Sequence, residues 1–378
     1  MKFEISRDRL IDGLSDVMKA VSSKAAVPIL TGIKLEVDDE GLYLTGSDSD
    51  ITIRTFVPAE EDGEQLIRTD ERGAIVLQAK YFSEIVRKLP TNLVEIEVSN
   101  HLQTHIRSGK SEFHLIGSDA DDYPQLPEID DDRHFAIPSD LLKTIIRETV
   151  FAVSTSESRP ALTGVHWEVK EGELVCVATD SHRLARRKTS LENAPEDEYS
   201  IVIPGKSLQE LNKILEDSGD AVGITMSNKQ VLFRAGHVLF YSRLLEGNYP
   251  DTSRLIPSEY KTDITVNGRT LLQSIDRASL LAREERNNVV RFTADGSNTV
   301  EISSNSPEIG KVEEQVETSS MEGEELKIAF SAKYMMDALR AIEGQDIVIR
   351  FTGAMRPFVL KSVEDDTLLQ LILPVRTY

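Results

Sequence analysis

The sequence predicts an α+β protein built from three tandem copies of one unit, each with two helices packed on antiparallel sheets. Three observations lead to this prediction. A block of sequence recurs after 132 residues, a strand–lysine–helix signature occurs three times, and short alternating strands follow the predicted helices. The chain has 378 residues, which suits two or three domains, and 40% of them are hydrophobic, enough to fill ordinary cores.

The first and second copies match without a gap. Segment 28–33 (PILTGI) returns as 160–165 (PALTGV), and Asp48-Ser49 returns as Asp180-Ser181. Because the order of apolar positions is also kept, the two segments are expected to adopt the same fold. The third copy is more divergent in its centre.

The signature consists of an apolar strand, a small residue, a lysine and a helix. The small residue–lysine pairs are 79–80, 205–206 and 332–333. Apolar residues follow at i, i+3, i+4 and i+7 in the first and third copies and more loosely in the second, as in a helix with one buried face. We predict helices over 7–24, 80–89, 139–148, 206–216, 269–286 and 333–343. We place the domains at 1–127, 128–257 and 258–378, with the Asp130-Asp131-Asp132 run in the first junction, which lies near 127–133.

Charge and composition limit the function classes. A net charge of −21 argues, by itself, against a nucleic-acid partner. The six predicted helices nevertheless carry 17 basic and 13 acidic residues, which leaves −25 for the rest of the chain. A basic lining inside an acidic exterior is one explanation, and helix surfaces that simply carry Lys and Arg are another. Cys176 lies in an apolar strand and is expected to be a buried hydrophobe.

Equivalent units joined in one orientation can close into a ring. Six units of this size would leave a hole roughly 36 Å wide, enough for a nucleic-acid duplex. The start of the chain lacks the pattern of a signal peptide and no stretch is long and apolar enough to span a membrane, so we expect a cytosolic protein.

Two apparent catalytic motifs are weak. Gly205-Lys206-Ser207 resembles the end of a P-loop, but position 200, where the motif requires glycine, is a serine. Asp180-Ser181-His182 contains the residue types of a hydrolase triad, but neighbours on an extended chain point to opposite sides. We favour a binding surface there. A hydrolase that uses Ser181 and His182, and an acidic scaffold that binds only proteins, remain the alternatives. The scattered histidines show no metal-ligand spacing.

Three strings resemble one family. Segments 178–184 (ATDSHRL), 247–251 (GNYPD) and 373–376 (LPVR) are similar to the bacterial DNA polymerase III beta subunits, or beta sliding clamps, and the resemblance covers the whole chain. It implies DNA-clamp domains, a head-to-tail homodimeric ring of six domains with helices lining the hole, and no catalytic residue, metal or cofactor. The implied partners are double-stranded DNA encircled without sequence preference, a second copy of the chain, a clamp loader, and DNA polymerases and other proteins with a short clamp-binding peptide motif. The implied location is cytoplasmic and nucleoid-associated.

The resemblance also implies site residues. Those expected to contact DNA are Lys24, Lys80, Ser156, Arg159 and Lys206. Those expected at the dimer interface are Phe113 and Leu115 of one chain, facing Leu280 and Leu281 of the other. Those expected to form the partner-peptide pocket are Leu162, Thr179, Ser181, His182, Arg183, Leu184, Pro250, Arg254, Leu255, Tyr334, Met355, Pro357, Leu371, Ile372, Leu373, Pro374, Val375 and Arg376. The alternative is that these residues only seal internal junctions. Ser181 departs from the family, which carries glycine there, and Thr377-Tyr378 extend the tail.

Overall fold

The computed structural model describes residues 1–126, 129, 134–193, 195, 198–282, 288–343 and 346–376. It divides into two compact units. Unit 1 comprises Met1–Leu142 and Lys206–Leu244, and unit 2 comprises Lys143–Gly205 and Leu245–Tyr378. Most of the predicted junction at 127–133, including its aspartates, and the tail residues Thr377 and Tyr378 lie outside the described residues. Within the described ranges, no helix has the length and apolar character needed to cross a membrane.

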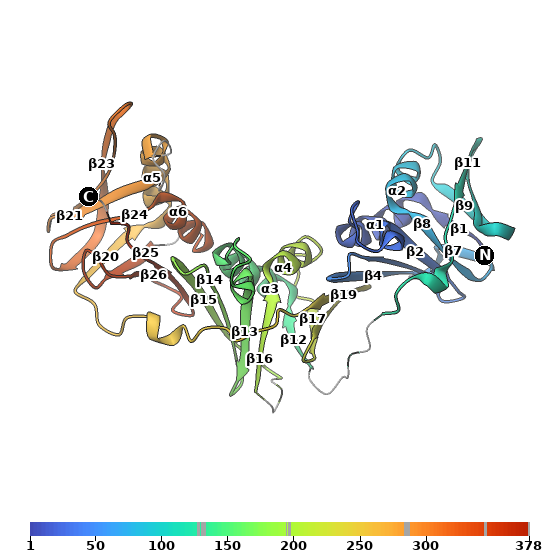
Figure 1. Cartoon of the computed structure of the whole chain (residues 1–378), viewed down its shortest axis with the longest axis horizontal. Helices are drawn as coiled ribbons and strands as arrows, with labels where there is room; N and C mark the ends of the chain where they lie inside the picture. Colours follow the sequence, from blue (N-terminus) through green and yellow to red (C-terminus); the bar gives the residue numbers. More distant parts are fainter. Residues whose placement is uncertain are drawn as a thin grey trace. The chain divides into compact units, whose positions relative to one another are not determined.

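Unit 1 contains two large antiparallel sheets and a short ribbon (Figure 1). The sheets have the strand orders β11-β10-β9-β1-β7 and β12-β17-β18-β19-β4-β3-β2-β8, and β5 pairs with β6. The strands are β1 (Lys2–Ser6), β2 (Gly32–Val37), β3 (Gly41–Ser47), β4 (Ile51–Pro58), β5 (Glu60–Glu61), β6 (Glu64–Gln65), β7 (Ile67–Glu71), β8 (Gly73–Gln78), β9 (Leu93–Val98), β10 (Gln103–Ser108), β11 (Ser111–Ile116), β12 (His134–Pro138), β17 (Ala221–Met226), β18 (Gln230–Ala235) and β19 (Val238–Arg243). Helix α1 (Arg7–Val17) packs on β3, β4 and helix α2 (Ala79–Arg87).

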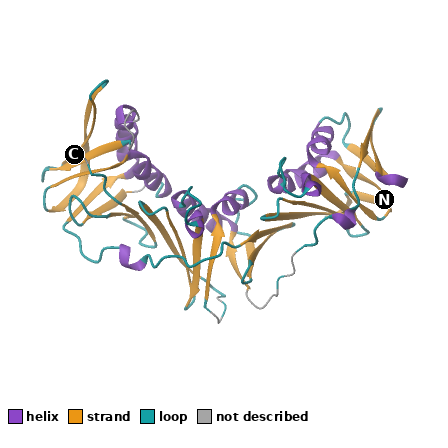
Figure 2. Cartoon of the chain, in the orientation of Figure 1, coloured by secondary structure: helices purple, strands orange, loops and turns teal. Residues whose placement is uncertain are grey.

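Unit 2 contains one extended antiparallel sheet of twelve strands, in the order β16-β13-β14-β15-β27-β26-β25-β20-β23-β22-β21-β24. Its strands are β13 (Gly164–Lys170), β14 (Glu173–Thr179), β15 (Arg183–Ser190), β16 (Tyr199–Pro204), β20 (Thr262–Asn267), β21 (Val289–Ala294), β22 (Thr299–Ser306), β23 (Gly310–Gly323), β24 (Leu326–Ser331), β25 (Asp346–Phe351), β26 (Phe358–Ser362) and β27 (Leu368–Ile372). Helices α5 (Gly268–Ala282) and α6 (Ala332–Ala341) pack side by side over an apolar core (Figures 1 and 2). Helices α3 (Ser139–Thr149) and α4 (Gly205–Asn212) begin next to the boundaries of the units.

The repeat predicted from the sequence is confirmed element by element. The bounds of β1 and α1 recur 132 residues later as those of β12 and α3. Ser49 and Ser181 even share a left-handed backbone, with φ of 82° and 80°. Helices α2, α4 and α6 each begin at the small residue of the signature, so the following lysine lies in the first turn.

Helices α2 and α6 end two residues earlier than predicted, and α1 and α4 end at least four residues earlier. Helix α1 ends at Val17 and is followed by a 3-10 turn, Met18–Ala20, beyond which Val21 is extended. Helix α4 ends at Asn212, because the next turns are closed by bonds to the third residue back, such as Ile214 N to Leu211 O at 2.9 Å. The helix predicted over 269–286 begins at Gly268, and its described part ends at Ala282.

The two compact units do not coincide with the three repeats, because strand pairing divides the central repeat. Its strands β12 and β17–β19 join the first repeat through β19, which pairs with β4. Its strands β13–β16 join the third repeat through β15, which pairs with β27. Continuous sheets therefore connect each half of the central repeat to a neighbour.

Candidate functional site

Pairing of β15 with β27 brings much of the predicted pocket together. Leu184 lies opposite Leu371, and Arg183 lies opposite Ile372. The contact continues beyond the strands, since Leu373 N donates to His182 O at 2.9 Å. Segments almost two hundred residues apart in the sequence thus become neighbours within unit 2.

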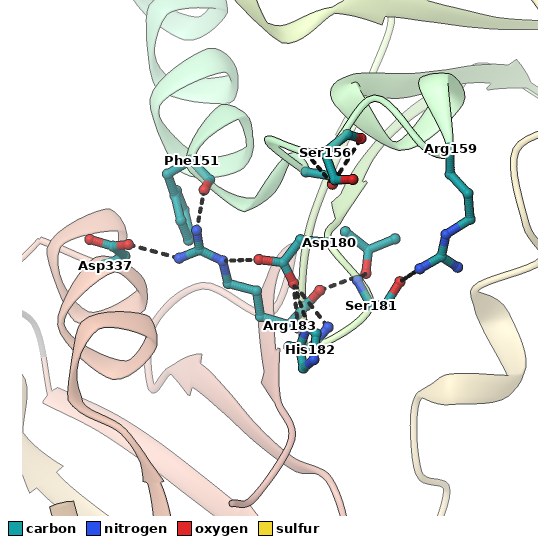
Figure 3. A network of polar contacts seen from close by, with 10 residues as sticks. Phe151, Ser156, Arg159, Asp180, Ser181, His182, Arg183 and Asp337 are labelled. Atoms are coloured by element: carbon teal, nitrogen blue, oxygen red, sulfur yellow. Dashed lines mark hydrogen bonds and ion pairs between the residues drawn. The ribbon is translucent and has the colours of Figure 1, made fainter. Parts of the chain in front are cut away.

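A tight turn at 179–183 presents the polar part of this site (Figure 3). The Asp180 carboxylate accepts bonds from the backbone N–H groups of His182 and Arg183 at 2.9 and 3.1 Å. Thr179 Oγ1 donates to Arg183 O at 2.6 Å. The turn requires the positive φ of Ser181, a backbone that favours glycine and explains why glycine suits this position.

The hydrolase alternative lacks its central contact. The Ser181 hydroxyl accepts a bond from Arg159 Nη2 at 2.7 Å, and His182 Nδ1 lies 4.0 Å from Asp180. A serine nucleophile needs a general base within hydrogen-bond reach, and here the hydroxyl meets a guanidinium instead. The arrangement therefore favours a binding surface over a nucleophile.

Arg183 links the turn to helix α6 (Figure 3). Its side chain is 8% exposed, and it donates to Asp180 at 3.0 Å, to Asp337 at 2.7 Å and to the Phe151 carbonyl at 2.6 Å. The guanidinium also lies 4.5 Å from the centre of the Tyr334 ring. The family resemblance places Arg183 in the partner-peptide pocket, and in the structure three of its five N–H donors are engaged within the chain.

The predicted pocket residues separate into a buried layer and an exposed one. The buried residues are Leu162, Thr179, Arg183, Leu184, Leu371 and Ile372. The half-buried residues are Tyr334, Pro357, Leu373, Pro374 and Val375, and the exposed ones are Ser181, His182, Pro250, Arg254, Leu255, Met355 and Arg376. Leu255 and Met355 are 51% and 55% exposed, so both apolar side chains are accessible at the surface. The half-buried and exposed residues are therefore accessible while the buried layer stays folded.

The structure has a hollow beside these residues and another that is remote from them. One, of about 430 Å³, lies in unit 2 and is lined by Met355, Val375 and Arg376 together with residues of β21 and β24. Another, of about 470 Å³, lies in unit 1 between α1 and the β18–β19 hairpin and includes none of the predicted site residues.

The predicted DNA contacts are all exposed. Lys80 and Lys206 lie in the first turns of α2 and α4, and Lys206 Nζ is 3.7 Å from the Asp48 carboxylate. Lys24 lies in the turn that follows the first helix. Ser156 bonds to the Ser158 hydroxyl at 2.9 Å, and Arg159 reaches Ser181.

The predicted dimer residues lie on an edge strand and on a helix. Strand β11, which carries Phe113 and Leu115, is the last strand of its sheet, and both side chains are half-buried. On α5, Leu280 is 58% exposed and Leu281 is half-buried. A different explanation for these four apolar residues is that all of them belong to the internal core, and their partial exposure argues against it.

The sequence analysis missed a cluster of possible metal ligands. His105, Glu112 and His114 place ligand atoms within 4.8 Å of one another, because His105 and His114 face each other across β10 and β11. The hairpin pairing was the signal that could have revealed this group. Arg107 donates to Glu112 at 3.0 Å and lowers the pKa of that carboxyl, so the carboxylate already has a cationic partner.

The fold and the site define a tandem three-domain protein with sheets that continue from domain to domain and an exposed surface suited to binding. Comparisons with known proteins agree. Models of the N-terminal, central and C-terminal domains of the DNA polymerase III beta subunit match residues 1–127, 136–251 and 253–376. The beta sliding clamps of Bacillus subtilis (strain 168) and Staphylococcus aureus (strain N315) are 58% and 48% identical, with full coverage of both chains.

Solved structures give the same result. The DNA polymerase sliding clamp of Bacillus subtilis superimposes with a TM-score of 0.98 at 58% identity, and the DNA polymerase III beta chain of Streptococcus pneumoniae with 0.95 at 41%, each with full coverage of both chains. The chain belongs to the DNA polymerase III beta subunit family, the beta sliding clamps.

Proposed function

We propose that this chain is a DNA sliding clamp that closes as a homodimeric ring around duplex DNA and tethers the replicative polymerase to it. The role is not catalytic, because a sliding clamp supplies processivity to another protein's active site. The observation that carries the proposal is the way in which consecutive domains are joined.

Both internal junctions follow one rule. The third strand after a domain's first helix pairs with the last strand of the next domain, as β4 does with β19 and β15 with β27. In the third domain the matching strand is β23, whose first part, residues 310–317, pairs on one side with β22. In the first domain the matching last strand is β11, which forms a sheet edge.

Applied between chains, the rule pairs β23 of one copy with β11 of another. Because each chain offers one of each strand, two copies can close a head-to-tail ring. The seam would bring Phe113 and Leu115 toward Leu280 and Leu281 of α5. Arg277, one turn before Leu280, binds Glu314 of β23 through two bonds of 2.7 and 2.6 Å and so fixes the helix to the strand.

DNA contacts are expected to be few and to reach only phosphates, because a sleeve that slides cannot read bases. Lys24, Lys80, Ser156, Arg159 and Lys206 are the proposed contacts. Affinity should fall as salt rises, while retention on closed circles should persist through topology. The clamp loader that places the ring is a further proposed partner.

The partner pocket is proposed to bind an extended peptide motif shared by polymerases and other replication and repair proteins. Exposed Leu255 and Met355 suit apolar anchors, and Met355 can adapt to different side chains. The cations Arg254 and Arg376 suit peptide carbonyls or acidic groups.

Deletion of residues 374–378 tests the pocket. We expect a folded dimer that a loader in excess still places on DNA but that no longer binds polymerase or supports processive synthesis. Deletion of 377–378 alone is the control, because it keeps the bond from Val375 N to Ala329 O at 2.7 Å. Unchanged polymerase affinity after the longer deletion, or an unfolded third domain, would refute the assignment.

A further inference from the structure

The hollow of about 430 Å³ in unit 2 extends beyond the predicted pocket. It shares Met355, Val375 and Arg376 with that pocket, and its floor is the outer face of β21 and β24. Arg291 lies opposite Ala329, and Thr293 lies opposite Lys327, so the four side chains share one face of the paired strands. Arg291, Lys327 and Arg376 are all exposed.

The counterpart of this place in the first domain is covered by the chain itself. In all three domains the segment after the last strand returns to bond the strand that precedes the second helix. The bonds are Ser118 N to Val76 O at 2.9 Å, Leu245 N to Val202 O at 2.9 Å and Val375 N to Ala329 O at 2.7 Å. In the first domain the chain then continues into the turn Ala120–Asp122, which packs on β8 and buries Ala120.

That covering turn is acidic, with Asp119, Asp121 and Asp122. In the third domain, the described residues that line the hollow include three cations and no carboxylate. Among the described residues, none of these three cations has an ion pair. In a protein of net charge −21, such an unpaired basic group favours an anionic ligand.

We propose that this basic hollow binds an acidic segment that flanks the clamp-binding motif of a partner, so that one peptide occupies the pocket and the hollow together. The proposal rests on the proposed function of the pocket and extends it to residues outside it, namely Arg291 and Lys327. Charge complementarity and the three shared residues support a peptide occupant.

The test measures fluorescence anisotropy of labelled peptides at low salt. The first probe is the clamp-binding segment of the replicative polymerase without an extension. Two further probes carry Asp-Asp-Glu at one end or the other, and each is matched by a neutral peptide with Ser-Ser-Gln at the same end. We expect the acidic extension at one end to tighten binding about tenfold over the neutral one, and raised salt to remove most of the gain. Lys327→Glu and Arg291→Glu should each abolish the gain and leave the unextended peptide unaffected.

Lys229→Glu, on the exposed β17–β18 turn of unit 1, makes the same charge change and should keep the gain. An equal gain in Lys327→Glu overturns the proposal. A gain in affinity that appears only after deletion of 377–378 also overturns it, since the chain's own end would then be the occupant. Weaker retention on DNA in Lys327→Glu, with the gain in peptide affinity intact, overturns it as well, since DNA would then be the ligand. If wild-type protein binds none of the peptides, the partner pocket itself is refuted, and the extension with it.

Discussion

Replacement of Arg183 by methionine should destabilise unit 2 far more than replacement of an exposed arginine. Methionine keeps the length of the side chain but leaves Asp180 and Asp337, which are 14% and 21% exposed, without their shared cation, and it removes the donor to the Phe151 carbonyl. Breaking a buried ion pair typically costs about 3–5 kcal/mol. Because Asp337 is also 3.6 Å from Arg340, we expect the lower end, about 3 kcal/mol.

Trp167 is a suitable probe, because it is the single tryptophan and is buried in β13, within the same sheet as Arg183. Urea unfolding followed by its fluorescence gives the free energy of unfolding of this region. Arg254→Met is the matched control, since Arg254 is 89% exposed and its pair with Asp251 lies at the surface, where an ion pair adds little to stability. If Arg183→Met costs no more than the control while peptide affinity falls, Arg183 serves the peptide and not the fold.

Three further predictions follow from other parts of the molecule. Burial raises the pKa of Glu148 from 4.5 to about 7. Between these two pH values the folded chain holds a proton that the unfolded chain has released, so the free energy of unfolding should fall by about 1–3 kcal/mol as pH rises from 4.5 to about 7. Melting curves at pH 5 and 8 should show a smaller loss of stability in Glu148→Gln than in the wild type. The same pH dependence in both proteins would refute the role of Glu148. Leu280→Asp, at a 58% exposed position, should yield a folded monomer, whereas a dimer that persists in sedimentation would contradict the proposed seam. Lys206→Ala should reduce the salt dependence of DNA binding by about one phosphate contact without releasing closed circles, and release in mild salt would argue against encirclement.

Local features of the fold followed from the sequence, and long-range ones did not. The repeated segment 28–33 predicted matching strands and turns because side-chain pattern and backbone preference act over a few residues. The end of α4 was misplaced since Leu215 continues the apolar spacing and is buried, although it lies outside the helix. The partnership of Arg183 with Asp337 spans 154 residues, and no local pattern distinguishes Asp337 from other exposed-looking carboxylates on a helix.

The two internal junctions share one backbone frame but differ in a single informative side chain. In the first junction, the position that matches Arg183 is Ile51, which is buried opposite Ser242 of β19. The helix position that matches Asp337 is Glu210, which pairs with Lys213 on its own helix at 2.8 Å. At this position the first junction thus has a buried apolar side chain, whereas the second has a buried ion pair that holds α6 and the Tyr334 ring beside the exposed turn at His182. Strand pairing supplies both junctions. The first junction also has an exposed contact, from Lys206 Nζ to the Asp48 carboxylate at 3.7 Å, whereas the link through Arg183 in the second is buried and fixes the orientation of the proposed binding surface.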